Sequence, residues 1–206
     1  MLSVRTSARS AVTTAAGLLL GALLTFAPAT SAHAQSTSGG TMTPATPAAP
    51  PRAADPADVA SIDAIVRALY ESISGPKGAP RDFDRLRTLY GPNARMIVTG
   101  MGPDGKPRMR NWSVEEYITA AGPGLMENGF YEREIGRRTD SFGNVWHIMS
   151  VYDSRYTPDS KPFARGINSI QLFKGADRWY IVNILWDSER PDNPIPADRI
   201  TVKDRD

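Results

Sequence analysis

Four long runs of β-type residues, joined by short turns, fill the last third of the sequence and constrain its fold most strongly. Each run contains β-branched and aromatic residues, and the four cover residues 130–139, 145–156, 163–174 and 178–187. Turn-forming residues separate them at 140–144, 157–162 and 175–177. Because strands joined by such short connections pair as antiparallel neighbours, the pattern predicts an antiparallel meander.

The sequence before the meander carries helical patterns instead. Apolar residues recur at helical spacing from Val59 to Ile73, which predicts one helix capped by Asp58. A short helix is expected over residues 83–90 and a strand over 94–99. A capping box at residues 113–116 opens a third helix, which Gly-Pro-Gly at 122–124 is expected to interrupt. Helices followed by a meander predict an α+β fold, with the helices on one face of the sheet.

The final hairpin permits an estimate of strand register. Centring its turn on Ala176 places Asp187 opposite Arg165, which predicts a structural ion pair between them. The same estimate places Trp179 and Ile181 on the sheet face of Arg165. Large apolar residues then occupy both faces, whereas a sheet with one solvated face alternates more regularly. We therefore expect a second copy of the chain to cover the face that the helices leave open, in a homodimer.

The first 34 residues have the features of a secretory signal peptide. Arg5 and Arg9 precede an apolar stretch over residues 11–27, and Ala-His-Ala at 32–34 supplies the pattern that a signal peptidase recognises. The strongly apolar part is shorter than the roughly 20 residues of a spanning helix, so no stable membrane anchor is expected. The pattern predicts export by the general secretory route to the periplasm or the extracellular space.

Three further regions are expected after cleavage. Residues 35–56 are rich in Ala, Pro, Ser and Thr without apolar periodicity, which is typical of a disordered linker. Residues 57–200 form a single domain, and residues 201–206 form a short tail.

Composition excludes several kinds of site. Cleavage removes two of the 24 basic residues and none of the 22 acidic ones, so the exported chain is neutral and has no electrostatic attraction for nucleic acid. The chain has no cysteine, which excludes disulfides, thiolate metal sites and cysteine nucleophiles. His147 is the only histidine after cleavage, and no phosphate loop or nucleophile elbow appears. We expect neither a metal ion nor a cofactor.

Two segments resemble the nuclear transport factor 2-like superfamily, which includes ketosteroid isomerases and SnoaL-like polyketide cyclases. They are Leu-Tyr-Gly-Pro-Asn-Ala-Arg-Met at residues 89–96 and Phe-Lys-Gly-Ala-Asp-Arg-Trp-Tyr-Ile-Val at 173–182. Small secreted bacterial members are also similar at residues 165–171 and 184–187. The resemblance implies a cone of three N-terminal helices packed on a curved, mostly antiparallel sheet. It also implies a pocket inside the cone and frequent dimers, but it specifies no activity, because one fold hosts many.

The comparison with ketosteroid isomerases fails at the residues that carry their chemistry. That branch has a carboxylate base where Ile97 and Val98 stand here, and a second acidic group in the region of residues 166–169, which contains no acid. Proton transfer at an enolisable carbon needs a base at the carbon and a donor at the oxygen. Isomerase chemistry with that set of residues is therefore not expected.

His147 is the candidate for acid–base catalysis, because it alone in the exported chain has an unperturbed pKa near neutrality. It either faces the cone as an acid, base or ligand-binding group, or serves as a structural strand residue. The other candidate pocket residues are aromatic or can form hydrogen bonds: Trp112, Tyr117, Trp146, Ser150, Tyr152, Asn168 and Trp186. The alternative role for the aromatic residues is ordinary core packing.

Three functions remain open. The first is binding of a small apolar or aromatic molecule in a pocket of a few hundred Å³. The second is a cofactor-independent lyase, isomerase or cyclase that uses His147, which requires this side chain to point into the cone. The third is a protein-interaction module that uses the sheet face.

Overall fold

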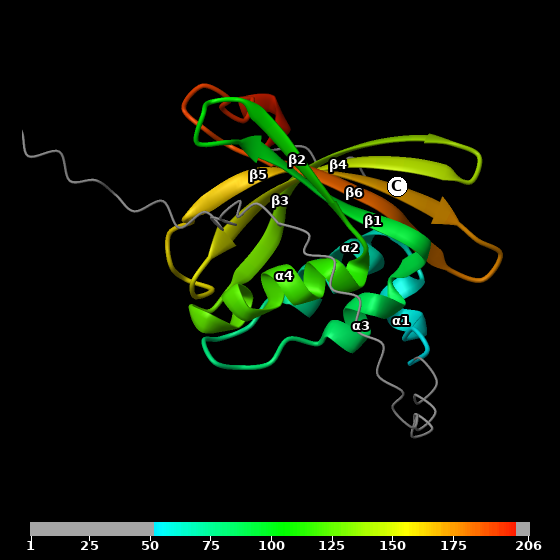
Figure 1. Ribbon diagram of the computed structural model, residues 1–206. Helices are drawn as coiled ribbons and strands as arrows, with labels where there is room; N and C mark the ends of the chain where they lie inside the picture. The colour runs from blue at the N-terminus through cyan, green and yellow to red at the C-terminus, as the bar shows by residue number, and fades with distance from the viewer. Residues whose placement is uncertain (1–51, 201–206) are drawn as a thin grey trace, which may run out of the picture.

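The computed structural model describes residues 52–200. The predicted signal peptide, most of the predicted linker and the predicted tail lie outside these residues. The predicted domain start at residue 57 falls one position after the first helix begins. Within the described part, Figure 1 shows helices gathered on one side of a strongly curved sheet. The predicted α+β class is confirmed.

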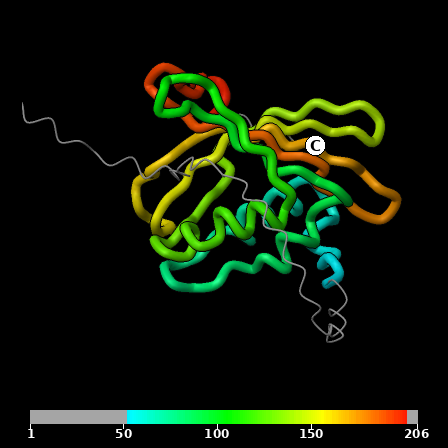
Figure 2. The backbone as a smooth tube through the Cα atoms, viewed as in Figure 1, coloured from blue at the N-terminus to red at the C-terminus, as the bar shows by residue number. Residues whose placement is uncertain are grey.

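Six strands form the sheet in the order β2-β1-β6-β5-β4-β3. Their bounds are β1 Tyr90–Met101, β2 Pro107–Trp112, β3 Tyr131–Phe142, β4 Val145–Arg155, β5 Ala164–Lys174 and β6 Trp179–Ser188. The last four strands are antiparallel neighbours, as the short turns predict. The chain can be followed through these hairpins in Figure 2. Strand β1 pairs in parallel with β6, so the curved sheet is mixed at one junction.

Four α-helices precede or interrupt the strands. They are α1 Pro56–Val59, α2 Ile62–Ile73, α3 Phe83–Thr88 and α4 Val114–Glu127, and the 3₁₀ helix η1 Ala197–Arg199 follows the sheet. Side chains of α2 and of strands β4 to β6 form the centre of the core. Ile65 and Leu69 of α2 are buried there together with Ile148, Ile170 and Ile181. We call the sheet face that carries Ile148 and Ile170 the inner face and the opposite one the outer face.

The first predicted helix is two helices in the structure. Asp58 does not cap α2, because its carboxylate receives two hydrogen bonds from Arg85 of α3. Ser61 caps α2 instead, and its Oγ accepts a hydrogen bond from the Ala64 amide at 3.1 Å. Asp58 thus joins α1 to α3, a tertiary contact that apolar spacing does not reveal.

The predicted interruption of α4 at residues 122–124 is wrong. The helix continues through Pro123 to Glu127. Tertiary packing overrides the weak local propensity, since Leu125 enters the core beyond the proline. A Cβ added at Gly122 would stand 3.2 Å from the Phe83 ring, so the absence of a side chain lets α4 approach α3 closely.

Arg81 fixes the ends of α2 and α4 relative to one another. Its buried guanidinium donates to the carbonyl oxygens of Ile73 and Leu125, at 3.0 and 2.5 Å. These carbonyls belong to the last turns of the two helices, where no intrahelical donor is available. Both residues also line the cavity described below, so Arg81 holds one edge of that cavity.

The predicted register of the last hairpin is wrong by one residue next to the turn and by two residues beyond Leu172. Asp187 pairs with Ile167 rather than with Arg165, and the register shifts between Gln171 and Leu172. Such a bulge adds one residue to β6 and reverses the faces beyond it. Trp179 and Ile181 are therefore buried in the core on the inner face, not on the face of Arg165.

The predicted ion pair between Arg165 and Asp187 is absent for the same reason. Arg165 donates two hydrogen bonds to Glu189, at 2.8 and 3.0 Å. Asp187 pairs with Arg190, three residues further along the chain. The displaced register moves Arg165 past the end of β6, where Glu189 is the available carboxylate.

Part of the outer face is covered by the chain itself. The segment after β6 passes beside Met149, Ile167 and Leu185, with which residues 193–196 line a shallow hollow. Its end packs so closely on β3 that a Cβ at Gly136 would collide with the Arg199 carbonyl oxygen. The remainder of this face stays open in the single chain.

Candidate functional site

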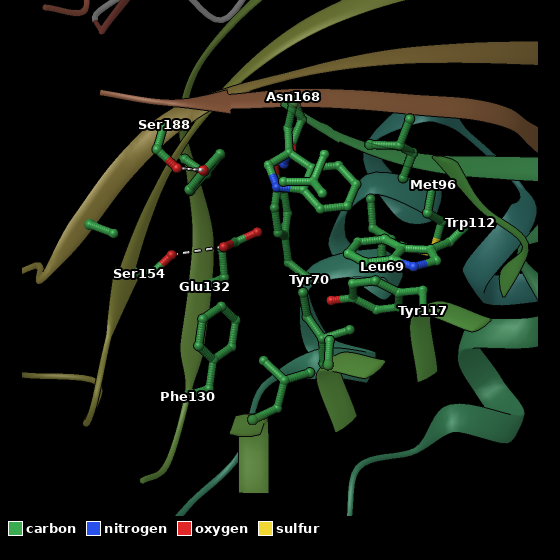
Figure 3. A pocket seen from close by; sticks show the side chains of 18 of the residues that line it. Leu69, Tyr70, Met96, Trp112, Tyr117, Phe130, Glu132, Ser154, Asn168 and Ser188 are labelled. Atoms are coloured by element: carbon green, nitrogen blue, oxygen red, sulfur yellow. Dashed lines mark hydrogen bonds between the residues drawn. The ribbon is translucent and has the colours of Figure 1, made fainter. Parts of the chain in front are cut away.

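A cavity of about 190 Å³ lies between α2, α4 and the inner face of the sheet. Figure 3 shows its side chains converging from these elements. Its wall is mostly apolar and includes Leu69, Met96, Leu125, Ile184 and Phe130. An engineered apolar cavity of about 150 Å³ holds a benzene molecule. This cavity therefore has room for one ring and a short substituent.

Strand alternation explains which residues reach the cavity. Successive side chains of a strand point to opposite faces, so every second residue of β4, β5 and β6 faces inward. Tyr152, Ser154, Asn168 and Trp186 occupy such inward positions and line the cavity. The strands thus supply polar groups, while the helices supply mainly apolar ones.

Five of the seven predicted pocket residues meet at the cavity. They are Trp112, Tyr117, Tyr152, Asn168 and Trp186. The ring of Tyr117 lies between two tryptophans, with its centroid 6.3 Å from Trp112 and 6.1 Å from Trp186. These distances are typical of favourable tilted and edge-to-face aromatic contacts. Trp112 and Tyr117 come from the consecutive elements β2 and α4, whereas Trp186 comes from β6, about 70 residues further along the chain.

Trp146 and Ser150 do not line the cavity. Trp146 packs edge-to-face on Trp179, with ring centroids 5.4 Å apart, in another part of the inner face. Ser150 is fully buried behind the cavity wall, where its hydroxyl interacts with Tyr70 and donates to Glu134. Both side chains point inward, as their strand parity requires, but neither reaches the cavity surface.

His147 lies on the outer face. Its neighbour Ile148 is buried in the core, so alternation directs the His147 side chain away from the cavity. Its Nε2 is 2.8 Å from the Ser169 hydroxyl on the adjacent strand β5. The placement that acid–base catalysis in the cone requires is therefore not met. The geometry agrees with the structural alternative, a histidine hydrogen-bonded across two strands.

Among the cavity residues that the sequence prediction misses, Glu132 is the one with a carboxylate. It lies on β3, and its carboxylate accepts a hydrogen bond from Ser154 at 2.8 Å (Figure 3). Burial raises the pKa of Glu132 from 4.5 to about 7, against the opposing effect of hydrogen bonds from Ser154 and Asn168. The nearby Asp153 carboxylate raises this pKa further. At neutral pH, Glu132 therefore exists in both protonation states.

A weak signal for Glu132 is present in the sequence. Glu132 and Glu134 follow Phe130 at every second position, so all three share one face at the start of the strand. An acid on the face that a large aromatic residue marks as inward is unusual. Sequence alone does not show which face of β3 turns toward the helices.

A chain of hydrogen bonds leads from the cavity into the core. Asn168 Nδ2 donates to the Tyr70 hydroxyl at 3.1 Å, and this hydroxyl is 2.7 Å from Ser150 Oγ. Ser150 donates to Glu134, which pairs with Arg137 through two hydrogen bonds of 3.0 and 2.9 Å. These linked hydrogen bonds hold Tyr70 and Asn168 in fixed orientations at the cavity wall.

Within residues 52–200, no group of three or more potential metal ligands comes together. No helix in the same part of the chain is long and apolar enough to cross a membrane. The cavity accordingly offers one carboxylate, several hydroxyls and an amide as its chemical groups.

No family model and no curated protein matches the chain. Solved structures with similar folds include a protein of unknown function with a cystatin-like fold from Nostoc punctiforme. Its TM-score is 0.48, and it is 10% identical over 63% of this chain and 90% of that chain. An NTF2-like protein of unknown function from Shewanella baltica has a TM-score of 0.40 and 17% identity over 61% and 91% of the two chains. The CaMKII hub of S. rosetta has a TM-score of 0.41 and 14% identity over 61% and 89%.

The α+β fold is consistent with the resemblance to the nuclear transport factor 2-like superfamily. The element order, the curled sheet and the helices inside its curve agree with the cone that the resemblance implies. Val98, one of the two residues that the resemblance places where ketosteroid isomerases have their base, lines the cavity. The carboxylate of this cavity comes instead from β3, through Glu132.

Proposed function

We propose that the protein binds a small, largely apolar molecule in the cavity between the helices and the sheet. The observation that carries this proposal is the cavity itself, whose apolar and aromatic wall encloses a few fixed polar groups. Ligand sites commonly combine an apolar lining with a small number of placed polar side chains. Its volume of about 190 Å³ favours a molecule with a single ring.

A variant that fills the cavity tests this proposal. Ala121 of α4 lines the cavity, whereas its neighbour Ala120 does not, so Ala121→Phe and Ala120→Phe form a matched pair. We expect saturable binding of a single-ring probe such as 2-phenylethanol to wild type and Ala120→Phe, measured by calorimetry, and no binding to Ala121→Phe. Native mass spectrometry of the protein from its own cells would detect a retained ligand. Equal binding by all three proteins would locate the probe elsewhere and contradict the proposal.

A second candidate function is acid–base catalysis on the bound molecule, with Glu132 instead of His147 as the acid–base group. Its support is a carboxyl group in an apolar cavity with a pKa of about 7, which suits proton transfer near neutral pH. Glu132 would remove a proton from the carbon beside a carbonyl group and later return one. Deuterium incorporation into 1-phenylpropan-2-one in D₂O, followed by NMR, tests this role. Equal rates for wild type and Glu132→Gln would exclude it.

Export by the general secretory route is part of the proposal. It is supported by the arginines, the apolar stretch and the Ala-His-Ala pattern of the first 34 residues. Cleavage after Ala34 would leave Gln35 at the amino terminus. Mass spectrometry of the mature protein from a periplasmic or culture-medium fraction tests this, and a retained Met1 would contradict it.

We also propose that two copies of the chain associate through their outer faces. Phe173, Val182 and Leu185 are exposed there, at 44%, 44% and 37%. Because the exported chain has no net charge, two copies do not repel each other through their net charge. Light scattering should give a dimer for wild type and for Thr119→Lys on α4, and a monomer for Val182→Lys. A monomeric wild type would end this part of the proposal and favour an interaction surface for another protein.

A further inference from the structure

Glu132, which is half-buried where it faces the cavity, differs in its partners from three buried carboxylates of the described chain. Three buried acids each pair with an arginine: Asp58 with Arg85, Glu134 with Arg137 and Asp153 with Arg155, at 2.7, 2.9 and 2.8 Å. The hydrogen bonds that Glu132 receives come from neutral groups, the Ser154 hydroxyl and the Asn168 amide. Within residues 52–200, no arginine or lysine forms an ion pair with Glu132, whereas the nearby Asp153 carboxylate is paired with Arg155 and Arg133.

A buried carboxylate without a cation is costly in its ionised form. Removing the charge from water is unfavourable unless an opposite charge and hydrogen bonds replace the lost solvation. Glu132 nevertheless faces a cavity that a molecule can enter, not a sealed core. The missing positive charge is therefore one that a bound molecule can supply.

The aromatic wall of the cavity favours the same kind of molecule. Trp112, Tyr117, Trp186 and Phe130 line it, and Figure 3 shows Tyr117 and Glu132 approaching from opposite sides. Aromatic faces carry negative potential and attract ammonium groups, an effect that strengthens when both partners are shielded from water. The cavity thus combines an apolar space for a ring with a carboxylate and several aromatic side chains in its wall.

We infer that the ligand of this cavity is a small primary amine, whose single ring contacts the aromatic wall and whose ammonium group pairs with Glu132. This inference rests on the proposed binding function and names its ligand class. The Asn168 amide and the Tyr70 hydroxyl are held by their own hydrogen bonds beside the carboxylate. A ring with a two-carbon arm that ends in an amine matches a cavity slightly larger than one that holds benzene.

Three probes of nearly equal shape separate this inference from the general binding proposal. They are 2-phenylethylamine, 2-phenylethanol and phenylacetate, which are cationic, neutral and anionic at pH 8. In calorimetric titrations of the wild-type protein, the dissociation constant of the amine should be at least roughly tenfold lower than that of the alcohol. The reason is that a charge-assisted contact replaces a neutral one. Phenylacetate should bind most weakly, since Glu132 would repel it.

Two glutamate variants complete the design. Glu132→Gln keeps the size of the side chain and an oxygen for Ser154 but removes the charge. Glu127→Gln makes the same change at an exposed position of α4 that does not line the cavity. We expect Glu132→Gln to lose the preference for the amine and to keep its affinity for the alcohol, which also reports an intact fold. Glu127→Gln should behave as wild type.

The outcomes separate the two proposals. If the alcohol binds wild type as tightly as the amine, or if Glu132→Gln keeps the preference for the amine, the amine inference is wrong while cavity binding stands. If none of the three probes gives saturable binding, both fail. The amine preference of wild type, its loss in Glu132→Gln and its persistence in Glu127→Gln together would establish the inference.

Discussion

Replacing Glu132 with glutamine is expected to stabilise the protein, and to do so far more at pH 8 than at pH 5. Burial raises the pKa of this carboxyl from 4.5 to about 7 in the folded protein. Between these pH values the folded state holds a proton that the unfolded state has released. The stability associated with protonated Glu132 is therefore lost as the pH rises from about 4.5 to about 7. Glutamine cannot ionise and escapes this loss.

The size of the effect follows from the two pKa values. Each pH unit between 4.5 and about 7 corresponds to 1.36 kcal/mol, so ionisation lowers the free energy of unfolding by about 3 kcal/mol at pH 8. At pH 5 the loss is under about 1 kcal/mol, because this pH lies only slightly above the unfolded-state pKa of 4.5. The advantage of Glu132→Gln over wild type should grow by about 2 kcal/mol across this range.

The other groups around Glu132 keep one protonation state between pH 5 and 8. Hydrogen bonds from Arg155 and Arg133 outweigh burial and hold the pKa of Asp153 below its usual range, so it stays ionised. Burial raises the pKa values of Tyr70, Tyr117 and Tyr152 above 10, so they stay neutral.

Urea unfolding followed by tryptophan fluorescence at pH 5 and pH 8 measures this difference. Glu127→Gln is the matched control and should differ from wild type by a few tenths of a kcal/mol at either pH, as surface substitutions usually do. Destabilisation by Glu132→Gln at pH 8, or a difference from wild type that does not change with pH, would refute the reasoning. The second result would mean that Glu132 ionises as freely in the folded protein as in the unfolded chain.

Three further substitutions test packing around the site by urea unfolding. Arg137→Met leaves Glu134 buried without its cation and should lower the free energy of unfolding by about 3–5 kcal/mol. A loss below about 1 kcal/mol would show that the pair is not buried in solution. Ser113→Ala removes the capping box of α4 and should cost about 1 kcal/mol, and no loss would indicate that α4 starts elsewhere. Gly166→Ala places a methyl group against the Asp187 carbonyl oxygen and should cost about 1–3 kcal/mol, whereas a neutral result would contradict the close approach of β5 and β6.

Local sequence signals predicted the types and the order of most elements, although not strand β2. The four strands of the meander lie within a few residues of their predicted ranges, because turn residues and β-type runs act locally. The capping box at Ser113 is present for the same reason. Local signals failed at Pro123, where packing of Leu125 keeps the helix continuous. They also failed at Asp58, whose partner Arg85 lies 27 residues away.

The tertiary structure alone decided which side chains share a site. One added residue in β6 turned Trp179 inward and moved Arg165 from Asp187 to Glu189, and no count along the sequence locates such a bulge. His147, the only histidine expected in the exported chain, lies outside the cavity because the opposite face of β4 turns toward the helices. Glu132 lines the cavity because it lies on the face of β3 that turns toward the helices. Alternation fixes which residues share a face, but only packing against the helices fixes which face encloses the cavity.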